Sequence, residues 1–207
     1  MTKSTKLTAQ SASEIQALLH HILLGTVGHL GKEFFENMVV CLVNAIGASR
    51  AIVTECTNEE KTRLRTLAYV VNKEIRENVE YDTTGTPCKV IMESKKALYV
   101  PYNTERDYPA EKGIESYVGI PILNLHEEIL GHIAVYHEDH FGFSVEKINV
   151  LKIFAARCAA EIERLDAERK LKKVLAENEA LKNSLKLENS NLRSEVSQKN
   201  IYTQSGT

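Results

Sequence analysis

The segment Tyr81–Cys88 places a carboxylate, several hydroxyls and a thiol within eight residues. These groups could hydrogen-bond a small molecule that lies against a neighbouring sheet. The candidate ligand-binding residues of this segment are Tyr81, Asp82, Thr84, Thr86 and Cys88. The same residue types also satisfy the backbone groups of a turn and cap a following helix. The segment therefore predicts either one wall of a ligand pocket or an ordinary turn before a helix, and both interpretations stay open.

Tyrosines gather in the residues that follow this segment. Each offers an apolar ring with one polar tip, which suits a pocket for a planar ligand, although core packing explains the tyrosines equally well. The remaining candidate ligand-binding residues are Tyr99, Tyr108, Ser116, Tyr117 and Tyr136.

Redox and metal chemistry are the alternatives for this region. Cys88 stands at the start of a predicted helix, where the helix N-terminus would lower the thiol pKa and favour a redox or metal sensor. The histidines at positions 126, 132, 137 and 140 could suggest a metal site. His132 and His137 point to opposite faces of a regular strand and cannot share one metal, and no third ligand is evident beside His137 and His140, so the histidines are interpreted as solvated loop residues. We expect no metal site, and no particular cofactor is indicated. We also expect no enzyme, because no nucleophile–base pair, phosphate loop or paired-carboxylate motif stands out.

The composition is typical of a soluble globular protein, with 43% hydrophobic and 26% charged residues among 207. A formal net charge of −2 gives no overall bias toward nucleic acid or anionic membranes. No apolar run reaches the roughly 18 residues that cross a bilayer, and the polar N-terminus lacks the apolar core of a signal peptide. We therefore expect a cytoplasmic protein that binds neither nucleic acid directly nor a membrane.

Helical and strand-like periodicities alternate along the chain in an order typical of an α+β fold. Helical spacing predicts helices over residues 15–23 and 32–46, and a short helix that begins at Pro87. β-branched and alternating segments predict strands over residues 51–57, 66–75, 97–102, 117–123 and 129–137. Pro121 should lie at a sheet edge or a bulge, because proline cannot donate a ladder hydrogen bond.

A long helix is predicted from Ser144 onward. Its apolar residues repeat at steps of three and four in two seams, from Ile148 to Leu165 and from Leu171 to Leu192. The six-residue step between the seams shifts their phase and implies a local change of winding. We therefore predict a parallel homodimer through the helix Ile148–Leu192, with Asn178 fixing the register.

Three sequence blocks resemble a subgroup of the GAF domain family, over about residues 34–165. YDTTGTPC (81–88), ESYVGIPI (115–122) and GHIAV (131–135) are similar to the subgroup's YDL-GTPC, ESYLGVPL and GHLAV. The departure is Thr83-Thr84, where the subgroup has an apolar residue followed by a small one. The resemblance implies a GAF-like antiparallel sheet flanked by helices, with a ligand pocket on one face.

The resemblance also implies a sensory role, because such domains feed histidine kinases, cyclic-dinucleotide enzymes or transcription activators. We expect an N-terminal helical extension (1–30), a GAF-like sensory domain (31–165), a coiled-coil signalling helix (166–200) and a disordered tail (201–207). Binding of an unidentified small molecule would be transmitted through the dimeric helix to an output domain or partner of the kinase, cyclase or transcription-activator type. The alternative function is a dimerisation module with a vestigial pocket.

Overall fold

The computed structural model describes the backbone of residues 28–204 and side chains as far as residue 191. The predicted helix over residues 15–23, and with it nearly all of the extension 1–30, lies outside the described residues. The elements are α2 (Gly31–Ile46), β1 (Arg50–Cys56), β2 (Arg63–Val71), β3 (Glu74–Ile75), β4 (Glu80–Asp82), α3 (Pro87–Ser94), β5 (Leu98–Val100), α4 (Thr104–Asp107), β6 (Ser116–Leu123), β7 (Ile129–His137) and α5 (Val145–Gln204). Helices flanking an antiparallel sheet confirm the predicted α+β fold class.

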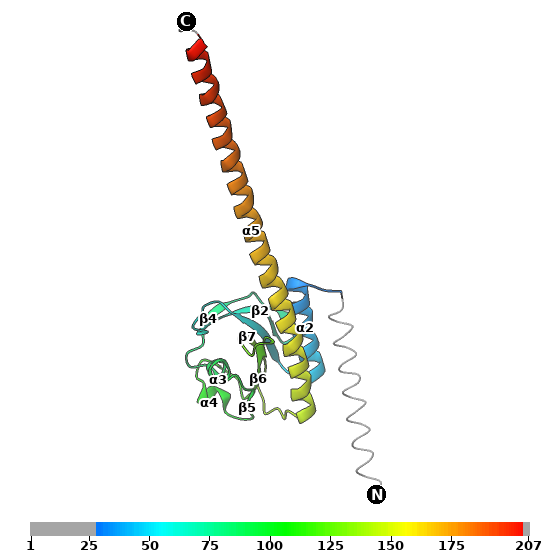
Figure 1. Ribbon diagram of the computed structural model, residues 1–207. Coiled ribbons are helices and arrows are strands. Elements are labelled where there is room, and N and C mark those ends of the chain that lie inside the picture. The colour runs from blue at the N-terminus through cyan, green and yellow to red at the C-terminus, as the bar shows by residue number, and fades with distance from the viewer. Residues whose placement is uncertain (1–27, 205–207) are drawn as a thin grey trace. The chain divides into compact units, whose positions relative to one another are not determined.

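The strands described by the structure form one seven-stranded sheet in the order β3-β2-β1-β7-β6-β5, with β4 pairing to β2. Every pairing in it is antiparallel. Figure 1 shows α2 and the first part of α5 on one side of this sheet, and α3 and α4 on the other. The two faces of the sheet are therefore covered differently, by long helices on one side and by short helices and loops on the other.

The first part of α5 packs into the domain's own core. Leu151, Ala155, Cys158 and Ile162 are all buried, and the Cys158 thiol lies 3.7 Å from the sulfur of Met38 in α2. The predicted dimer contact through Ile148–Leu165 is therefore wrong for these residues. A helix that buries one stripe against a core and a helix in a coiled coil share the same three-and-four spacing, so the pattern alone could not separate them.

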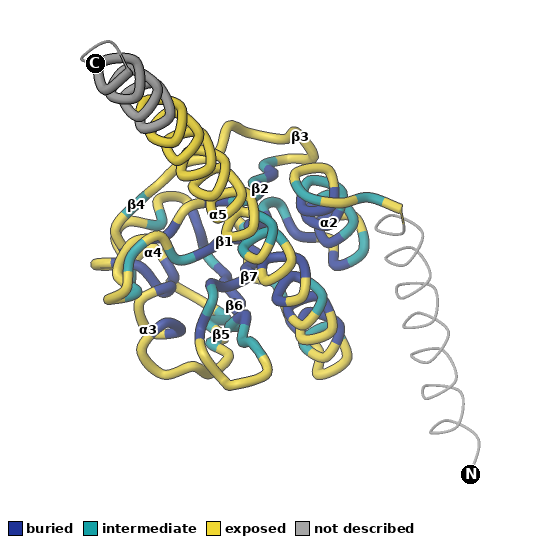
Figure 2. Tube along the Cα trace, turned by 45° about the horizontal axis from the view of Figure 1, so that its top comes forward, coloured by how far each residue is buried: buried dark blue, intermediate teal, exposed yellow. Residues whose placement is uncertain are grey.

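The chain divides into two compact units after Glu163, and α5 contributes to both. Within the second unit, residues 169–191 are exposed along the whole circumference of the helix (Figure 2). Ion pairs one turn apart support this part of the helix, including Lys170–Asp166 and Lys172–Glu168, each at 2.7 Å. The helix continues to Gln204, past residue 200 and into the segment for which disorder was predicted.

The predicted strand over residues 66–75 is interrupted by a tight turn. Asn72 and Lys73 both adopt left-handed backbone conformations, with φ of 49° and 68°, and they reverse the chain from β2 into β3. Asparagine tolerates this conformation, but lysine gives no turn signal. The pairing of β6 with β5 ends at Gly119, two residues before Pro121. Pro121 therefore has no β5 partner and lies at an open sheet edge, as predicted.

Candidate ligand pocket

A cavity of about 320 Å³ lies on the α3 side of the sheet, and we call it the sheet cavity. Its β1 residues, Arg50 and Ile52, alternate with Ala51 and Val53, which point to the face covered by α2. Ile52 also belongs to a buried cluster that includes Ile91 of α3. The wall of the sheet cavity consists of Arg50, Ile52, Thr66, Tyr69, Val79, Tyr81, Asp82, Thr84, Thr86, Ala110, Glu111 and Tyr136.

A β-bulge in β2 turns toward the sheet cavity two residues that a regular strand would place on opposite faces. Tyr69 pairs with Ile52 of β1, whereas Thr66 pairs with Thr54 after a shift in register. Residues three apart in a regular strand point to opposite faces. The register shift leaves Leu67 without a partner on β1, so Thr66 and Tyr69 both reach the cavity.

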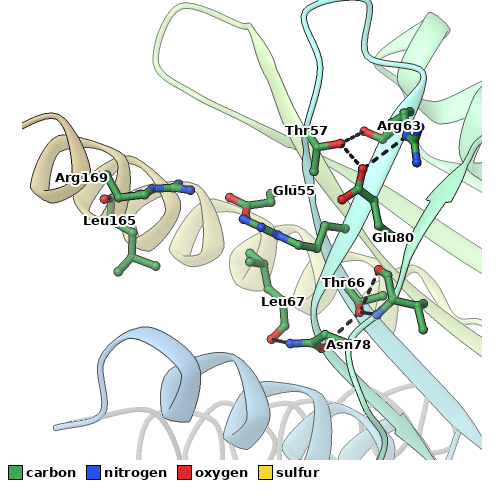
Figure 3. Close-up of polar contacts among 11 residues, drawn as sticks. Glu55, Thr57, Arg63, Thr66, Leu67, Asn78, Glu80, Leu165 and Arg169 are labelled. Atoms are coloured by element: carbon green, nitrogen blue, oxygen red, sulfur yellow. Dashed lines mark hydrogen bonds and ion pairs between the residues drawn. The ribbon is translucent and has the colours of Figure 1, made fainter. Parts of the chain in front are cut away.

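Hydrogen bonds from the chain after β3 hold this bulge in place (Figure 3). The side-chain amide of Asn78 donates to the Leu67 carbonyl at 3.2 Å, and its oxygen accepts from the Thr66 hydroxyl at 3.1 Å. The Val79 N–H donates to the same Thr66 hydroxyl at 2.8 Å. These hydrogen bonds fix the β-bulge, and the bulge in turn holds Thr66 and Tyr69 at the cavity wall.

Three charged groups border the sheet cavity: Arg50, Glu111 and the exposed Asp82. The Arg50 guanidinium is held through Nη2 by the Glu138 carboxylate at 2.9 Å, while its buried Nε has no hydrogen-bond partner among the described residues. A buried donor left unpaired costs about 1–3 kcal/mol, and more when it is charged. Burial raises the pKa of Glu111, against the opposing attraction of Arg50. Within the described chain, no donor is hydrogen-bonded to the Glu111 carboxylate.

The segment Tyr81–Cys88 combines the two roles that its sequence left open. Tyr81, Asp82, Thr84 and Thr86 all border the sheet cavity. Asp82 also accepts the Thr84 N–H at 2.8 Å, which confirms the predicted turn. The predicted helix cap is wrong, because the Thr86 hydroxyl donates to the Thr83 carbonyl at 2.7 Å and makes no cap bond to α3.

Cys88 lies beneath the cavity and does not border it. Its sulfur is 3.7 Å from the Tyr81 hydroxyl and 4.0 Å from the Tyr117 hydroxyl, and the residue is fully enclosed. Burial raises the pKa of the Cys88 thiol to about 11. The lowered thiol pKa expected at a helix start is therefore wrong, since desolvation outweighs the effect of a short helix.

The other candidates are divided between cavity and core. Tyr136 borders the cavity, and its ring meets the ring of buried Tyr117 edge-on at 5.0 Å. Ser116 is buried and accepts the N–H of Phe141 at 2.8 Å, which fixes the chain after β7. Outside the cavity wall lie Cys88, Tyr99, Tyr108, Ser116 and Tyr117.

Sequence reasoning named Asp82 but missed the other two charged residues of the cavity, Arg50 and Glu111. Arg50 begins β1 and is followed by three buried apolar residues, and an arginine at such a position was a usable signal for a pocket. Glu111 lies in a loop without periodicity, and nothing in the sequence singled it out. Thr66 faces the cavity only because of the bulge, which strand alternation cannot predict.

His132 is buried in β7, so its interpretation as a solvated loop residue is wrong. Its Nδ1 shares a hydrogen bond of 2.7 Å with the Thr54 hydroxyl, and its Nε2 has no partner. Burial lowers the pKa of His132 to about 3. The sheet register places His132 and His137 on opposite faces, as predicted. Among the described residues, no cluster of three His, Cys, Asp or Glu side chains could hold a metal ion.

An antiparallel sheet with long helices on one face and a cavity on the other is the architecture of a sensory-domain fold. The chain belongs to the GAF domain family, whose sequence model matches residues 32–162. GAF domains are sensory modules found in kinases and phytochromes. Among the described residues, no helix is both long and apolar enough to cross a membrane.

Solved structures with the same fold come from several kinds of protein. The GAF domain of a phosphoenolpyruvate-protein phosphotransferase from Coxiella burnetii is 17% identical, with a TM-score of 0.63 over 77% of this chain and 98% of its own. The A. aeolicus nlh2 GAF domain in an inactive state is 13% identical, with a TM-score of 0.57 over 75% and 98%. A phycocyanobilin-bound GAF domain from a cyanobacterial phytochrome is 12% identical, with a TM-score of 0.55 over 76% and 96%. No curated protein sequence matches this chain.

Proposed function

We propose that the chain is a homodimeric sensory module in which a small molecule binds the sheet cavity and α5 carries the response to an output domain or partner. The observation that supports this most strongly is the cavity itself, with a buried, unpartnered Arg50 Nε and the Glu111 carboxylate at its wall. Such polar groups around an apolar pocket are the usual features of a ligand site. A phytochrome domain of the same fold is bilin-bound, so this architecture accommodates ligands. The partner would be of the kinase, cyclase or transcription-activator type.

The cavity is connected to α5 through the end of β7. Tyr136 borders the cavity, and two residues later Glu138 holds Arg50. Downstream, Lys147 in the first turns of α5 donates to the Ile46 carbonyl at 3.2 Å and lies 4.3 Å from the centre of the Phe141 ring. A ligand that binds Arg50 would alter the Arg50–Glu138 ion pair. The segment between β7 and α5 would then favour one conformation. A ligand that prefers one conformation shifts the population toward it.

The second seam of α5 is the proposed dimer contact. Leu171, Val174, Leu181 and Leu185 are each more than half exposed in the single chain. Their heptad spacing would place them on one stripe, with Asn178 among them, and a second copy in parallel orientation would bury that stripe. A long helix with so polar a surface is marginally stable without a partner.

Native mass spectrometry of the freshly purified chain tests whether the cavity holds a small molecule. We expect a retained or added metabolite to increase the mass of the protein and to raise its melting temperature. Thr84→Trp should abolish both effects, because Thr84 is an exposed residue of the cavity wall and tryptophan would fill the space. Val90→Trp is the matched control, since Val90 is exposed on α3 but does not border the cavity.

The two variants separate cavity binding from binding elsewhere. Loss of ligand in Thr84→Trp alone supports the proposal. Equal binding by both variants would place the ligand outside the sheet cavity. A protein that binds nothing from a broad metabolite mixture would favour a dimerisation module with a vestigial pocket.

A further inference from the structure

We propose that the ligand of the sheet cavity is a small zwitterion, with its anionic group at Arg50 and its cationic group at Glu111. This inference rests on the proposed function and narrows it to a ligand class. Arg50 and Glu111 border the same cavity, yet they form no ion pair with each other in the described structure. The third charged group of the wall, Asp82, already accepts the Thr84 N–H. A molecule that carries both charges would pair with each of them.

The Arg50 side of the cavity is arranged for an anion. A guanidinium has five N–H donors, and Glu138 occupies one end of it at 2.9 Å. That contact fixes the orientation of the group while Nε remains buried without an acceptor. Carboxylates pair well with arginine because the planar fork offers two parallel N–H donors. A carboxylate of the ligand would give Nε the acceptor that the described residues do not provide.

The Glu111 side is arranged for a donor or a cation. The backbone of Glu111 is fixed on both sides, because its N–H donates to the Tyr108 carbonyl at 2.9 Å and its carbonyl accepts the Ile114 N–H at 3.2 Å. Its half-buried carboxylate faces the cavity without a hydrogen-bonded donor in the described chain. An ammonium group of the ligand would pair with this carboxylate and offset the cost of its burial.

The volume of the sheet cavity limits the size of the ligand. The volume of about 320 Å³ suits a metabolite of the size of an amino acid or a simple derivative. Ile52, Tyr69 and Tyr136 provide apolar surface for the rest of such a molecule. A purely anionic or uncharged ligand would leave the half-buried Glu111 carboxylate without a partner, which binding disfavours.

Isothermal titration of the full chain with the free proteinogenic amino acids, each tested separately, examines this proposal. For the amino acid that binds most tightly, the matching amine without the carboxylate and the matching acid without the amine are titrated as well. We expect each analogue to bind about tenfold or more weakly, the scale of one charge-assisted hydrogen bond. Equal affinity for the zwitterion and both analogues would overturn the proposal.

Two variants assign the two charges to their residues. Arg50→Gln should remove the preference for the zwitterion over the amine and keep the preference over the acid. Glu111→Gln should do the reverse. Arg76→Gln is the control, because Arg76 is half exposed, pairs with Glu74 and does not border the cavity. If Arg50→Gln does not fold, Arg50→Lys keeps the charge but removes Nε, and it should still weaken carboxylate binding.

Failure of this inference differs from failure of the proposed function. If the broad metabolite mixture yields a neutral or purely anionic ligand that Thr84→Trp excludes, the ligand class is wrong and the sensory function stands. If neither the mixture nor the amino acids bind, both are wrong. Zwitterion affinity that is unchanged in both Arg50→Gln and Glu111→Gln would also overturn the ligand class.

Discussion

Tyr117 connects two of the sequence blocks through packing. Its hydroxyl lies 4.0 Å from the Cys88 sulfur, and the side chain covers Gly119 so closely that a Cβ at that glycine would overlap the Tyr117 hydroxyl and Ile91. Sequence reasoning assigned Tyr117 and Cys88 to ligand contact. Their burial beneath the cavity explains why tyrosine, glycine and cysteine occur together here without a ligand being required.

Cys88 should be inert in the folded protein. Its thiol is enclosed and has a pKa of about 11, against an ordinary value of 9.0, so the reactive thiolate is about a hundredfold rarer at neutral pH. We expect alkylation of Cys88 by iodoacetamide, followed by peptide mass spectrometry, to be at least that much slower than in the unfolded chain. Equal rates in the folded and unfolded states would contradict the burial and restore a redox role for this residue.

His132 should make the fold sensitive to acid. Its folded pKa of about 3 lies below the ordinary value of 6.5, so the unfolded chain binds the proton first and stability falls as the pH drops through this interval. Between pH 7 and about pH 4.5 the loss from this residue should be on the order of 2–3 kcal/mol.

Urea unfolding at several pH values measures this loss. His132→Gln cannot titrate, and its stability should depend less on pH in this interval. Exposed His126 provides the control, and His126→Gln should retain the pH dependence of the parent chain. An identical pH dependence in His132→Gln and the parent would show that His132 is not responsible.

At the scale of the elements, glycine in β6 sets how closely α3 approaches the sheet. Gly119→Ala should lower the free energy of unfolding by about 1–3 kcal/mol, because the added methyl group overlaps Ile91 of α3 and the Tyr117 hydroxyl. Gly142→Ala is the matched control, since a Cβ there meets no atom, and its effect should stay within about 0.5 kcal/mol. Denaturant unfolding compares the two, and equal stabilities would contradict the close packing of α3 on β6.

Most elements could be predicted because their patterns are local. β-Branched residues identified the region of β1, alternation identified those of β6 and β7, and Pro87 marked the start of α3. The turn at Asn72-Lys73 was missed because it lacks the usual glycine, and the bulge at Leu67 because it depends on partners distant in the sequence. The turn residues of the cavity could be predicted because they are neighbours in the sequence. Arg50 and Glu111 could not, because only the folded sheet brings them to one cavity.

At the scale of the whole molecule, the second seam of α5 should determine the oligomeric state. Leu181→Asp should convert a dimer into monomers, because it places a charge in the proposed seam. Leu187 is exposed to a similar extent, 68% against 60%, but lies off the seam, so Leu187→Asp should remain dimeric. Sedimentation velocity at several concentrations distinguishes these outcomes. A monomeric parent chain, or two variants that behave alike, would contradict a dimer formed through this seam.

The most direct test of the central claim, that a small molecule binds the sheet cavity, is to map the bound ligand on the full chain by amide NMR. The protein is titrated with the tightest metabolite from the native mass measurement. The largest shift changes should occur at residues of the cavity wall, such as Thr66, Thr84 and Glu111, with the turn at residues 124–128 as an internal reference. Shift changes that spare the cavity wall and gather elsewhere would contradict the claim.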